Sequence, residues 1–370
     1  MKISIITSPF GGVPPNAIGA VEKRFYDVGQ VFYERGHDVS FYCCSGGENG
    51  KGTYIHILGY KRSRKLWIDL IKDFFYSLNV LWALKRTDIL IINTFWCPIL
   101  LAFFRKKYKK SFYSVARFPK GQFRFYRYID GFICPSRHIQ KALLQEKPSL
   151  ASKSIVIPNP VNTEIFTSKN VHKVNDKIEI IYTGRVHPEK GLHILAMAYS
   201  QLCLEFDNLT LTIVGAQSYA DGGGGDDYIT QLNTIVGNHP IQYVDAVRER
   251  KELAHIIQNA TIYCYPSIAM KGEAFGVAPL EAMALGMPVV ISNLECFSDF
   301  VISEENALIF ELGDNQVESL VCQLKRLICD EALRQRLGTN AACRSLDFST
   351  DKVANLLLHN FESLLKGTKA

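Results

Sequence analysis

Short apolar segments typical of strands alternate with helix-like segments along almost the whole chain. In the first half the apolar runs are MKISIIT, HDVSFYCC, TDILIIN, KSFYSVA, DGFICPS and KSIVIPN; in the second they are KIEIIYTG, LTLTIVG, IQYVD, ATIYCYPS, MPVVIS and ALIF. A strand–helix–strand rhythm favours a mostly parallel sheet with helices on both faces. This alternation therefore predicts an α/β fold built from doubly wound, Rossmann-like sheets.

The length of 370 residues exceeds what one ordinary core accommodates, so we expect two domains. Residues 165–177 are polar and without periodicity, which predicts a linker between a domain over 1–168 and another over 169–350. The segment DKVANLLLHNFESLL has apolar residues at helical spacing. It predicts a closing helix within 351–370 that completes the first domain.

The net charge of +6 conceals an asymmetry between the halves of the chain. Residues 1–170 contain 26 Lys and Arg against 11 Asp and Glu, whereas the remainder contains 16 against 25. A basic half suits nucleic acid, an anionic membrane or a phosphorylated substrate. No nucleic-acid-binding module is visible and the second half is acidic, so nucleic acid is not an expected partner.

Two basic segments flank an aromatic-rich helical stretch, KLWIDLIKDFFYSLNVLWALKR. Lys61, Arg62, Arg64 and Lys65 lie at its start, and the later segment FFRKKYKK adds five more cations. Basic residues interleaved with Trp and Phe suit the surface of an anionic membrane. Alternatively, the aromatic residues belong to the core and only the cations face solvent; these aromatic residues are Trp67, Phe74, Phe75 and Trp82.

The ten cysteines are scattered without zinc-ligand or redox spacing. The opening residues MKISIITSPFGG contain an apolar run too short for a signal peptide or a membrane span. We therefore expect reduced thiols and a cytoplasmic protein. The basic half suggests, in addition, that the protein associates with the inner face of a membrane.

Two loops that follow predicted strands offer groups for an anion. In GRVHPEKG, residues 184–191, Arg185 and Lys190 precede a helix start near Gly191, which suits a diphosphate. The alternative is a surface turn in which Glu189 pairs with both cations. The loop from residue 11 to residue 20 is rich in Gly and Pro, and either its amides approach a phosphate or it is an ordinary connection.

The stretch EAFGVAPLE places Glu273 and Glu281 around a Phe-Gly turn. We expect Pro279 and Glu281 in the first turn of a helix that ends at Gly286. An acid in the first turn stabilises the helix dipole by ~0.3–1 kcal/mol.

The glycine-rich segment 215–229 is expected to be a lid or spacer, because its aspartates repel phosphate. No DxD motif occurs, so no metal ion is expected.

Together these segments resemble the retaining glycosyltransferases of GT-B fold, glycosyltransferase family 4 (glycosyl transferases group 1). GRVHPEKG, ATIYCYPS, EAFGVAPLE and IPNPVNTEIF occur in the order of that family, and GVPPNAIGAVEKRF is similar to its opening loop and helix. The resemblance implies a GT-B architecture with two Rossmann-like domains facing a central cleft. It also implies transfer of a sugar from a nucleoside diphosphate of UDP, GDP or dTDP type to an acceptor hydroxyl, with retention and without cofactor or metal. The acceptor would be a glycan or a lipid-linked molecule, in bacterial surface polysaccharide or lipopolysaccharide biosynthesis.

The resemblance also implies roles for individual residues. Arg185 and Lys190 would contact the donor diphosphate, Glu273 would face the donor sugar, and Glu281 would accept hydrogen bonds from the ribose. The other donor-binding positions that it implies are Gly19, Ala20, Gly184, Phe275, Gly276 and Val277. Many relatives carry a histidine near the donor sugar where this chain has Arg117, with Lys120 close by, so these two residues are assigned only to the acceptor side.

Two other functions fit the same sequence. A nucleotide-sugar epimerase of the same fold needs no acceptor and would make an epimer from the donor alone. A degenerate glycan-binding protein would have kept the fold without catalysis. The intact Arg185, Lys190, Glu273 and Glu281 argue against degeneration, whereas Arg117 mildly favours it.

Overall fold

The computed structural model describes residues 1–14, 19–63, 65–168 and 177–367, and its contacts divide the chain into two units. Unit 1 comprises Met1–Pro160 and Thr350–Ala370, and unit 2 comprises Val161–Ser349. Most of the expected linker, residues 169–176, lies outside the described residues. The domain limits drawn from the sequence stay predictions.

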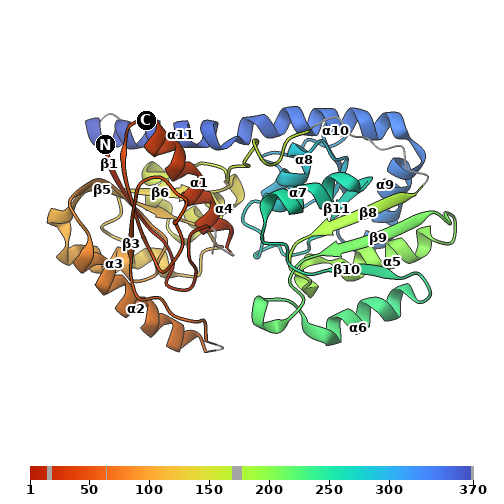
Figure 1. Ribbon diagram of the computed structural model, residues 1–370, viewed down its shortest axis with the longest axis horizontal. Helices are drawn as coiled ribbons and strands as arrows, with labels where there is room; N and C mark the ends of the chain where they lie inside the picture. The colour runs from red at the N-terminus through yellow and green to blue at the C-terminus, as the bar shows by residue number, and fades with distance from the viewer. Residues whose placement is uncertain (15–18, 64, 169–176, 368–370) are drawn as a thin grey trace. The chain divides into compact units, whose positions relative to one another are not determined.

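Unit 1 is built on a seven-stranded parallel sheet (Figure 1). In spatial order its strands are β3 (Thr53–His56), β2 (Asp38–Cys43), β1 (Lys2–Ile6), β4 (Thr87–Ile92), β5 (Tyr108–Ser114), β6 (Gly131–Cys134) and β7 (Ser154–Val156). The edge strand β3 was missed by the sequence analysis, because its four residues are only half-buried or exposed and carry no apolar run.

Helices cover this sheet on both faces, and the first and last helices of the chain pack together. They are α1 (Ala20–Glu34) and α11 (Thr350–Lys366), and the ring of Phe361 in α11 lies 6.1 Å from that of Phe32 and 4.7 Å from that of Phe112. The other helices of unit 1 are α2 (Leu66–Ala83), α3 (Cys97–Leu100) and α4 (Arg137–Glu146). The end of the chain thus contributes to the core of unit 1.

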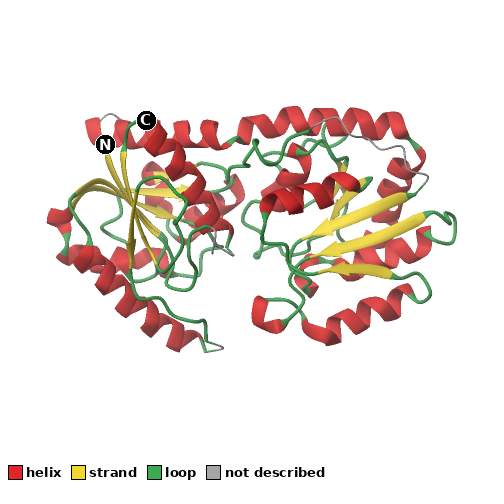
Figure 2. Cartoon of the chain, in the orientation of Figure 1, coloured by secondary structure: helices red, strands yellow, loops and turns green. Residues whose placement is uncertain are grey.

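Unit 2 contains a six-stranded parallel sheet with helices on both faces (Figure 2). The strand order is β10 (Ile241–Val244), β9 (Leu209–Val214), β8 (Ile178–Thr183), β11 (Ile262–Tyr265), β12 (Val289–Ser292) and β13 (Leu308–Phe310). Helices α5 (Leu192–Leu202), α6 (Gly225–Val236) and α9 (Gln316–Cys329) pack together, as do α7 (Arg250–Asn259), α8 (Val277–Ala284) and α10 (Glu331–Ser345). The predicted fold of two doubly wound parallel sheets is confirmed.

The order of the strands locates the place where a ligand is most readily bound in unit 2. The chain runs from β8 outward to β10 and then returns to β11 on the other side of β8. Loops that follow two strands at such a switch point diverge and leave a crevice at the carboxyl edge of the sheet. The two loops here are GRVHPEKG after β8 and the segment that leads into EAFGVAPLE after β11.

No helix within the described ranges combines the length and the apolar content that crossing a membrane requires.

Candidate active site at the carboxyl edge of the second sheet

The loops after β8 and β11 touch each other through their backbones. The amide of Ile268 donates to the carbonyl of Glu189 at 3.1 Å. Gly191 ends a short 3₁₀ turn, Pro188–Lys190, with φ of 68° and precedes α5, as predicted. A Cβ atom at Gly191 would lie 2.0 Å from the carbonyl oxygen of Pro266, so only glycine fits this contact.

Gly191→Ala is expected to lower the free energy of unfolding by about 2–3 kcal/mol, because the left-handed backbone and the displaced Pro266 carbonyl each carry a cost. Gly36→Ala is the matched control, since Gly36 has φ of 80° with open space around it. That control should lose only about 1 kcal/mol. Urea unfolding measures both variants, and equal losses would show that the contact between the loops is unimportant.

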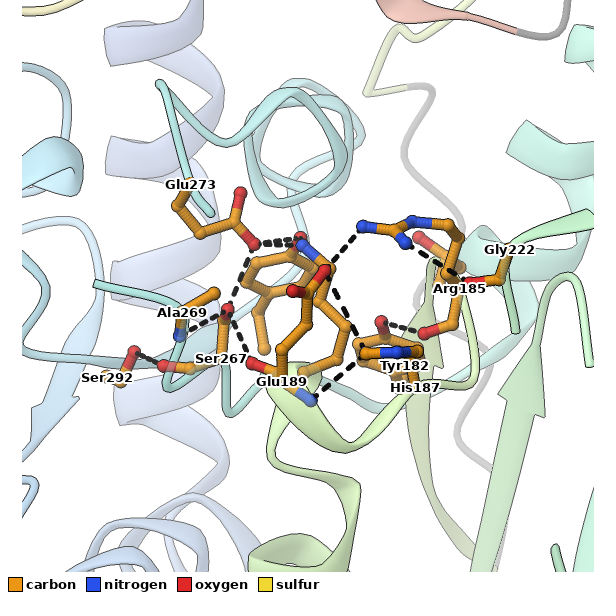
Figure 3. Close-up of polar contacts among 12 residues, drawn as sticks. Tyr182, Arg185, His187, Glu189, Gly222, Ser267, Ala269, Glu273 and Ser292 are labelled. Carbon is orange, nitrogen blue, oxygen red and sulfur yellow. Dashed lines mark hydrogen bonds and ion pairs between the residues drawn. The ribbon is translucent and has the colours of Figure 1, made fainter. Parts of the chain in front are cut away.

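A buried ion pair joins the two loops at the centre of this edge (Figure 3). The Lys190 ammonium pairs with Oε1 of Glu273, and each side chain is only 8% exposed. The same oxygen accepts hydrogen bonds from the Tyr265 hydroxyl at 2.9 Å and the Ser267 hydroxyl at 3.0 Å. Oε2 of Glu273 accepts no hydrogen bond from the described residues, so one oxygen remains for a ligand.

Tyrosines form the floor below this ion pair. Tyr265 stacks on Tyr182 with ring centroids 5.6 Å apart, and the Lys190 ammonium lies 5.8 Å from the centre of the Tyr265 ring. Burial raises the pKa of both phenols well above the ordinary value, and the Glu273 carboxylate adds to the rise. Both hydroxyls therefore stay protonated, and that of Tyr265 acts as a donor to the carboxylate.

Arg185 lies at the exposed side of the same loop. Its guanidinium pairs with Glu189 at 2.5 Å and donates to the carbonyl of Gly222 at 3.1 Å. The amide of Gly224 donates to the carbonyl of Val186 at 2.7 Å. The glycine-rich segment after β9 is therefore held against the GRVHPEKG loop, a contact that the sequence analysis missed. The alternative was a surface turn in which Glu189 pairs with both cations. Glu189 pairs with Arg185, but Lys190 pairs with Glu273, so this alternative is wrong for Lys190.

The structure corrects the position of Glu281. Helix α8 begins at Val277, with Gly276 at φ of 99° before it, so Glu281 is the fifth helical residue and the first turn contains no acid. The helix starts earlier than predicted because glycine allows the chain to turn sharply at 276. Stabilisation of the helix dipole therefore does not explain Glu281.

The Glu281 side chain is half-buried, and its charge acts on Tyr263 in β11. Burial raises the pKa of the Tyr263 phenol, and the Glu281 carboxylate adds to that rise. The Tyr263 hydroxyl in turn lies 2.8 Å from the hydroxyl of Thr183 at the end of β8. Glu281 thus belongs to the same edge of the sheet as Lys190 and Glu273.

The other residues of unit 2 that the resemblance assigns to donor binding offer backbone groups rather than reactive side chains. Phe275 is buried against the rings of Phe300 and Phe348, so its side chain belongs to the core. Gly276 and Val277 form the start of α8, where backbone amides point out of the helix. Gly184 follows the last residue of β8 with φ of 147°.

Four predicted residues lie in unit 1. Gly19 precedes α1 and Ala20 is its exposed first residue, while residues 15–18 of that loop lie outside the described ranges. Arg117 and Lys120 are exposed in the segment after β5. Their assigned roles stay predictions.

Sequence reasoning did not identify the residues that hold Glu273. Tyr265 and Ser267 donate to it, and the Ser267 carbonyl accepts from the Ser292 hydroxyl at 2.6 Å. One signal was present, because Tyr263 and Tyr265 alternate along ATIYCYPS and therefore lie on one face of the strand. Nothing in the sequence paired Lys190 with Glu273, since 83 residues separate them.

Within the described residues, no group of three or more His, Cys, Asp and Glu side chains is arranged to hold a metal ion. The positive charges of the site are supplied by Arg185 and Lys190. The expectation that no cofactor is needed stays a prediction.

Two family models together match most of the chain. One described as "Glycosyl transferases group 1" matches residues 164–344, and one described as "Glycosyltransferase Family 4" matches residues 21–165. The capsular polysaccharide biosynthesis glycosyltransferase CapM of Staphylococcus aureus is 27% identical over 47% of this chain and 43% of its own length. The phosphatidyl-myo-inositol mannosyltransferase of Mycobacterium leprae is 27% identical over 58% of this chain and 55% of its own length. The chain thus matches about half the length of these curated relatives.

Solved structures with the same fold cover the chain from end to end. Sucrose-phosphate synthase from Thermosynechococcus elongatus superposes with a TM-score of 0.79 at 20% identity, over 100% of both chains. Anabaena HepE, solved in complex with UDP and glucose, superposes with a TM-score of 0.76 at 17% identity, over 98% of this chain and 100% of its own. The fold and the two matching models agree, and the chain belongs to the GT-B glycosyltransferases of the family 4, or group 1, type.

Proposed function

We propose that the protein transfers a sugar from a nucleoside-diphosphate sugar to an acceptor hydroxyl, with retention at the anomeric carbon and without a metal ion. One observation carries the proposal: at the switch point of the second sheet, Lys190 from the loop after β8 pairs with Glu273 from the segment after β11, and the same two segments carry the exposed Arg185 and the half-buried Glu281. Cations and helix-start amides suit a diphosphate, whereas carboxylates accept hydrogen bonds from hydroxyls. A nucleotide sugar presents both kinds of group.

In the proposed reaction, the bond between the anomeric carbon and the diphosphate oxygen breaks, and its electron pair stays on that oxygen. Arg185, Lys190 and the amides at the start of α8 would stabilise the growing negative charge, because they are positioned before the reaction begins. The acceptor oxygen forms its new bond to the anomeric carbon on the face that the diphosphate leaves. The proton of the acceptor hydroxyl passes to the departing diphosphate and balances its charge.

The two cations differ in how readily they reach a ligand. The Arg185–Glu189 pair is 46% and 34% exposed, and exposed pairs contribute only ~0–1 kcal/mol, so a diphosphate could replace Glu189 at little cost. Lys190 is buried and fixed by Glu273. We therefore assign Arg185 as the cation that changes partner when the donor binds, and Lys190 as the cation that holds Glu273 in place.

The names of similar proteins support a donor and an acceptor class. HepE was solved with UDP and with UDP-glucose, which favours a UDP-type donor over the GDP and dTDP alternatives. CapM is named for capsular polysaccharide biosynthesis, and the mycobacterial relative for mannosylation of a phosphatidylinositol lipid. These names support a glycan or lipid-linked acceptor in surface polysaccharide, lipopolysaccharide or glycolipid synthesis.

A calorimetric titration with UDP, GDP, dTDP, ADP and CMP tests the proposal. One diphosphate should bind at one site per chain, and more tightly than the corresponding monophosphate, because the second phosphate reaches Arg185. Absence of binding by every nucleotide would refute a nucleotide-sugar donor.

Glu281→Ala is expected to weaken binding of that nucleoside diphosphate by ~1.5–3 kcal/mol, the typical contribution of a hydrogen bond to a charged group. Glu205→Ala removes an exposed carboxylate that pairs with Lys325, and it is the matched control with no expected effect. Calorimetry measures both variants. Unchanged affinity in Glu281→Ala would remove Glu281 from the ribose-binding role.

A further inference from the structure

A row of large apolar side chains lies uncovered on the outer side of α2 in unit 1. Figure 1 shows α2 at the border of this unit, and among the described residues no helix or strand of unit 1 lies over its outer side. The side chains that form the row are between 48% and 82% exposed. We call them the α2 surface, and they are Leu66, Trp67, Ile71, Phe75, Trp82 and, from the neighbouring segment, Phe103.

The spacing of these residues places them on one face of the helix. Trp67, Ile71, Phe75 and Trp82 follow one another at intervals of four, four and seven residues, which are close to one, one and two turns of an α-helix. The opposite face is buried in unit 1, and its residues are Asp73, Tyr76, Ser77, Val80 and Leu81. Assignment of the aromatic residues to the core is therefore wrong for Trp67, Phe75 and Trp82. Phe74 alone is half-buried, with its ring 5.5 Å from that of Trp96.

No charge interrupts the α2 surface. The three charged residues within α2 are Asp69, Lys72 and Asp73. Asp73 is buried and accepts hydrogen bonds from the backbone of the segment after β4. Asp69 and Lys72 lie 3.8 Å apart, and both bind the backbone of residues 61–63. The exposed side of α2 thus carries no charge, and Asn79 is the one polar residue of the helix that is exposed on it.

Basic segments are fixed at both ends of this apolar row. At the start, the Lys72 ammonium donates to the carbonyl of Lys61 at 2.7 Å, which ties the segment with the exposed Lys61, Arg62 and Lys65 to the first turns of α2. The Arg62 guanidinium lies over the ring of Phe10, 5.0 Å from its centroid. Arg64 lies outside the described residues.

At the other end, the Lys107 ammonium donates to the last carbonyls of α2, at 2.9 Å to Leu81 and 2.7 Å to Trp82. The ring of Phe104 lies 6.2 Å from that of Trp82. These contacts tie the segment with the exposed Arg105 and Lys106 to the last turn of α2, where the Arg105 guanidinium lies over the rings of Tyr108 and Tyr128.

We infer that the α2 surface docks on an anionic lipid bilayer, with α2 lying in the plane of the membrane interface. Trp and Phe rings bury their apolar area at the level of the headgroups, and long Lys and Arg side chains reach the lipid phosphates. An interfacial helix with cations at its ends binds anionic lipid more strongly than neutral lipid. A second copy of this chain would bring the same cations against each other, so charge complementarity favours lipid over self-association. The inference stands on unit 1 alone and does not depend on the proposed donor site.

The three tryptophans of the chain give a direct test with the full-length protein. Trp67 and Trp82 lie on the α2 surface, whereas the indole of Trp96 donates to the carbonyl of Leu70 on the inner side. Vesicles of phosphatidylcholine with 30% phosphatidylglycerol should shift the fluorescence to the blue, and brominated acyl chains should quench it. Vesicles of phosphatidylcholine alone should bind about tenfold more weakly, and high salt should remove the difference.

Trp67→Ala combined with Trp82→Ala should lower the partition coefficient on anionic vesicles by at least about tenfold in flotation, and should abolish the quenching. Leu204→Ala combined with Leu346→Ala removes two exposed apolar side chains from unit 2, and it is the control that should bind as well as wild type. Circular dichroism checks that both variants fold. Equal binding of the two variants would overturn the inference. It would also be overturned if the wild-type protein were a dimer in solution and the tryptophan variant a monomer.

Discussion

Lys190→Met is expected to lower the free energy of unfolding by about 3–5 kcal/mol, the cost of leaving one member of a buried ion pair without its partner. Glu273 would keep the hydrogen bonds from Tyr265 and Ser267 and lose the one cation that pairs with it among the described residues. The buried carboxylate would then have too little compensation for its lost hydration. Urea unfolding followed by circular dichroism measures the effect.

Lys325→Met is the matched control for this prediction. Lys325 also forms an ion pair with a glutamate, but the two side chains are 46% and 50% exposed, so its loss should cost only ~0–1 kcal/mol. Combining Lys190→Met with Glu273→Gln should restore much of the lost stability, because no unpaired charge remains. If Lys190→Met and Lys325→Met are equally stable, the Lys190–Glu273 pair does not stabilise the loops.

Arg185→Ala is expected to lower the rate of donor cleavage by ~10²–10³, the typical effect of removing one donor aimed at charge that develops in the transition state. Its effect on the Kd of the nucleoside diphosphate should be smaller, because the guanidinium helps most when the leaving oxygen carries its full charge. The fold should be unaffected, since Arg185 is exposed and its guanidinium contacts Glu189 and the Gly222 carbonyl at the surface of the loop.

Rates and calorimetric affinities measured on one batch of Arg185→Ala separate the two effects. Lys325→Ala removes a cation of unit 2 from outside the loops and should leave both quantities unchanged. Equal losses in rate and affinity would mean that Arg185 contributes uniform binding and does not act on the transition state.

The sheets could be predicted from the sequence because their signal is local. Buried parallel strands read as short apolar runs, and loops after them carry Gly and Pro, so the runs around Ile5, Ile91, Ile181 and Val290 identified their strands. The end of α1 has a local signal of the same kind, because Gly36 follows it with φ of 80°. Edge strand β3 lacked such a run and was missed.

The site was only partly predictable, because its main contacts join residues far apart in the chain. GRVHPEKG and EAFGVAPLE indicated Lys190 and Glu273 separately, but only the neighbouring positions of β8 and β11 bring them together. Whether Trp67 and Trp82 face the core or the solvent also depended on which side of α2 unit 1 buries. An amphipathic pattern does not decide this when both faces contain aromatic residues.

The most direct test of the proposed function follows the donor alone by proton NMR, with UDP-, GDP- and dTDP-sugars, a chelator and no acceptor. Wild-type protein should slowly cleave one of these donors to the nucleoside diphosphate, and the sugar should appear first with the anomeric configuration of the donor. Arg185→Ala should cleave it at least about a hundredfold more slowly. An epimerised donor, a sugar of inverted configuration, or equal cleavage by Arg185→Ala would contradict a retaining transferase that uses the loops after β8 and β11.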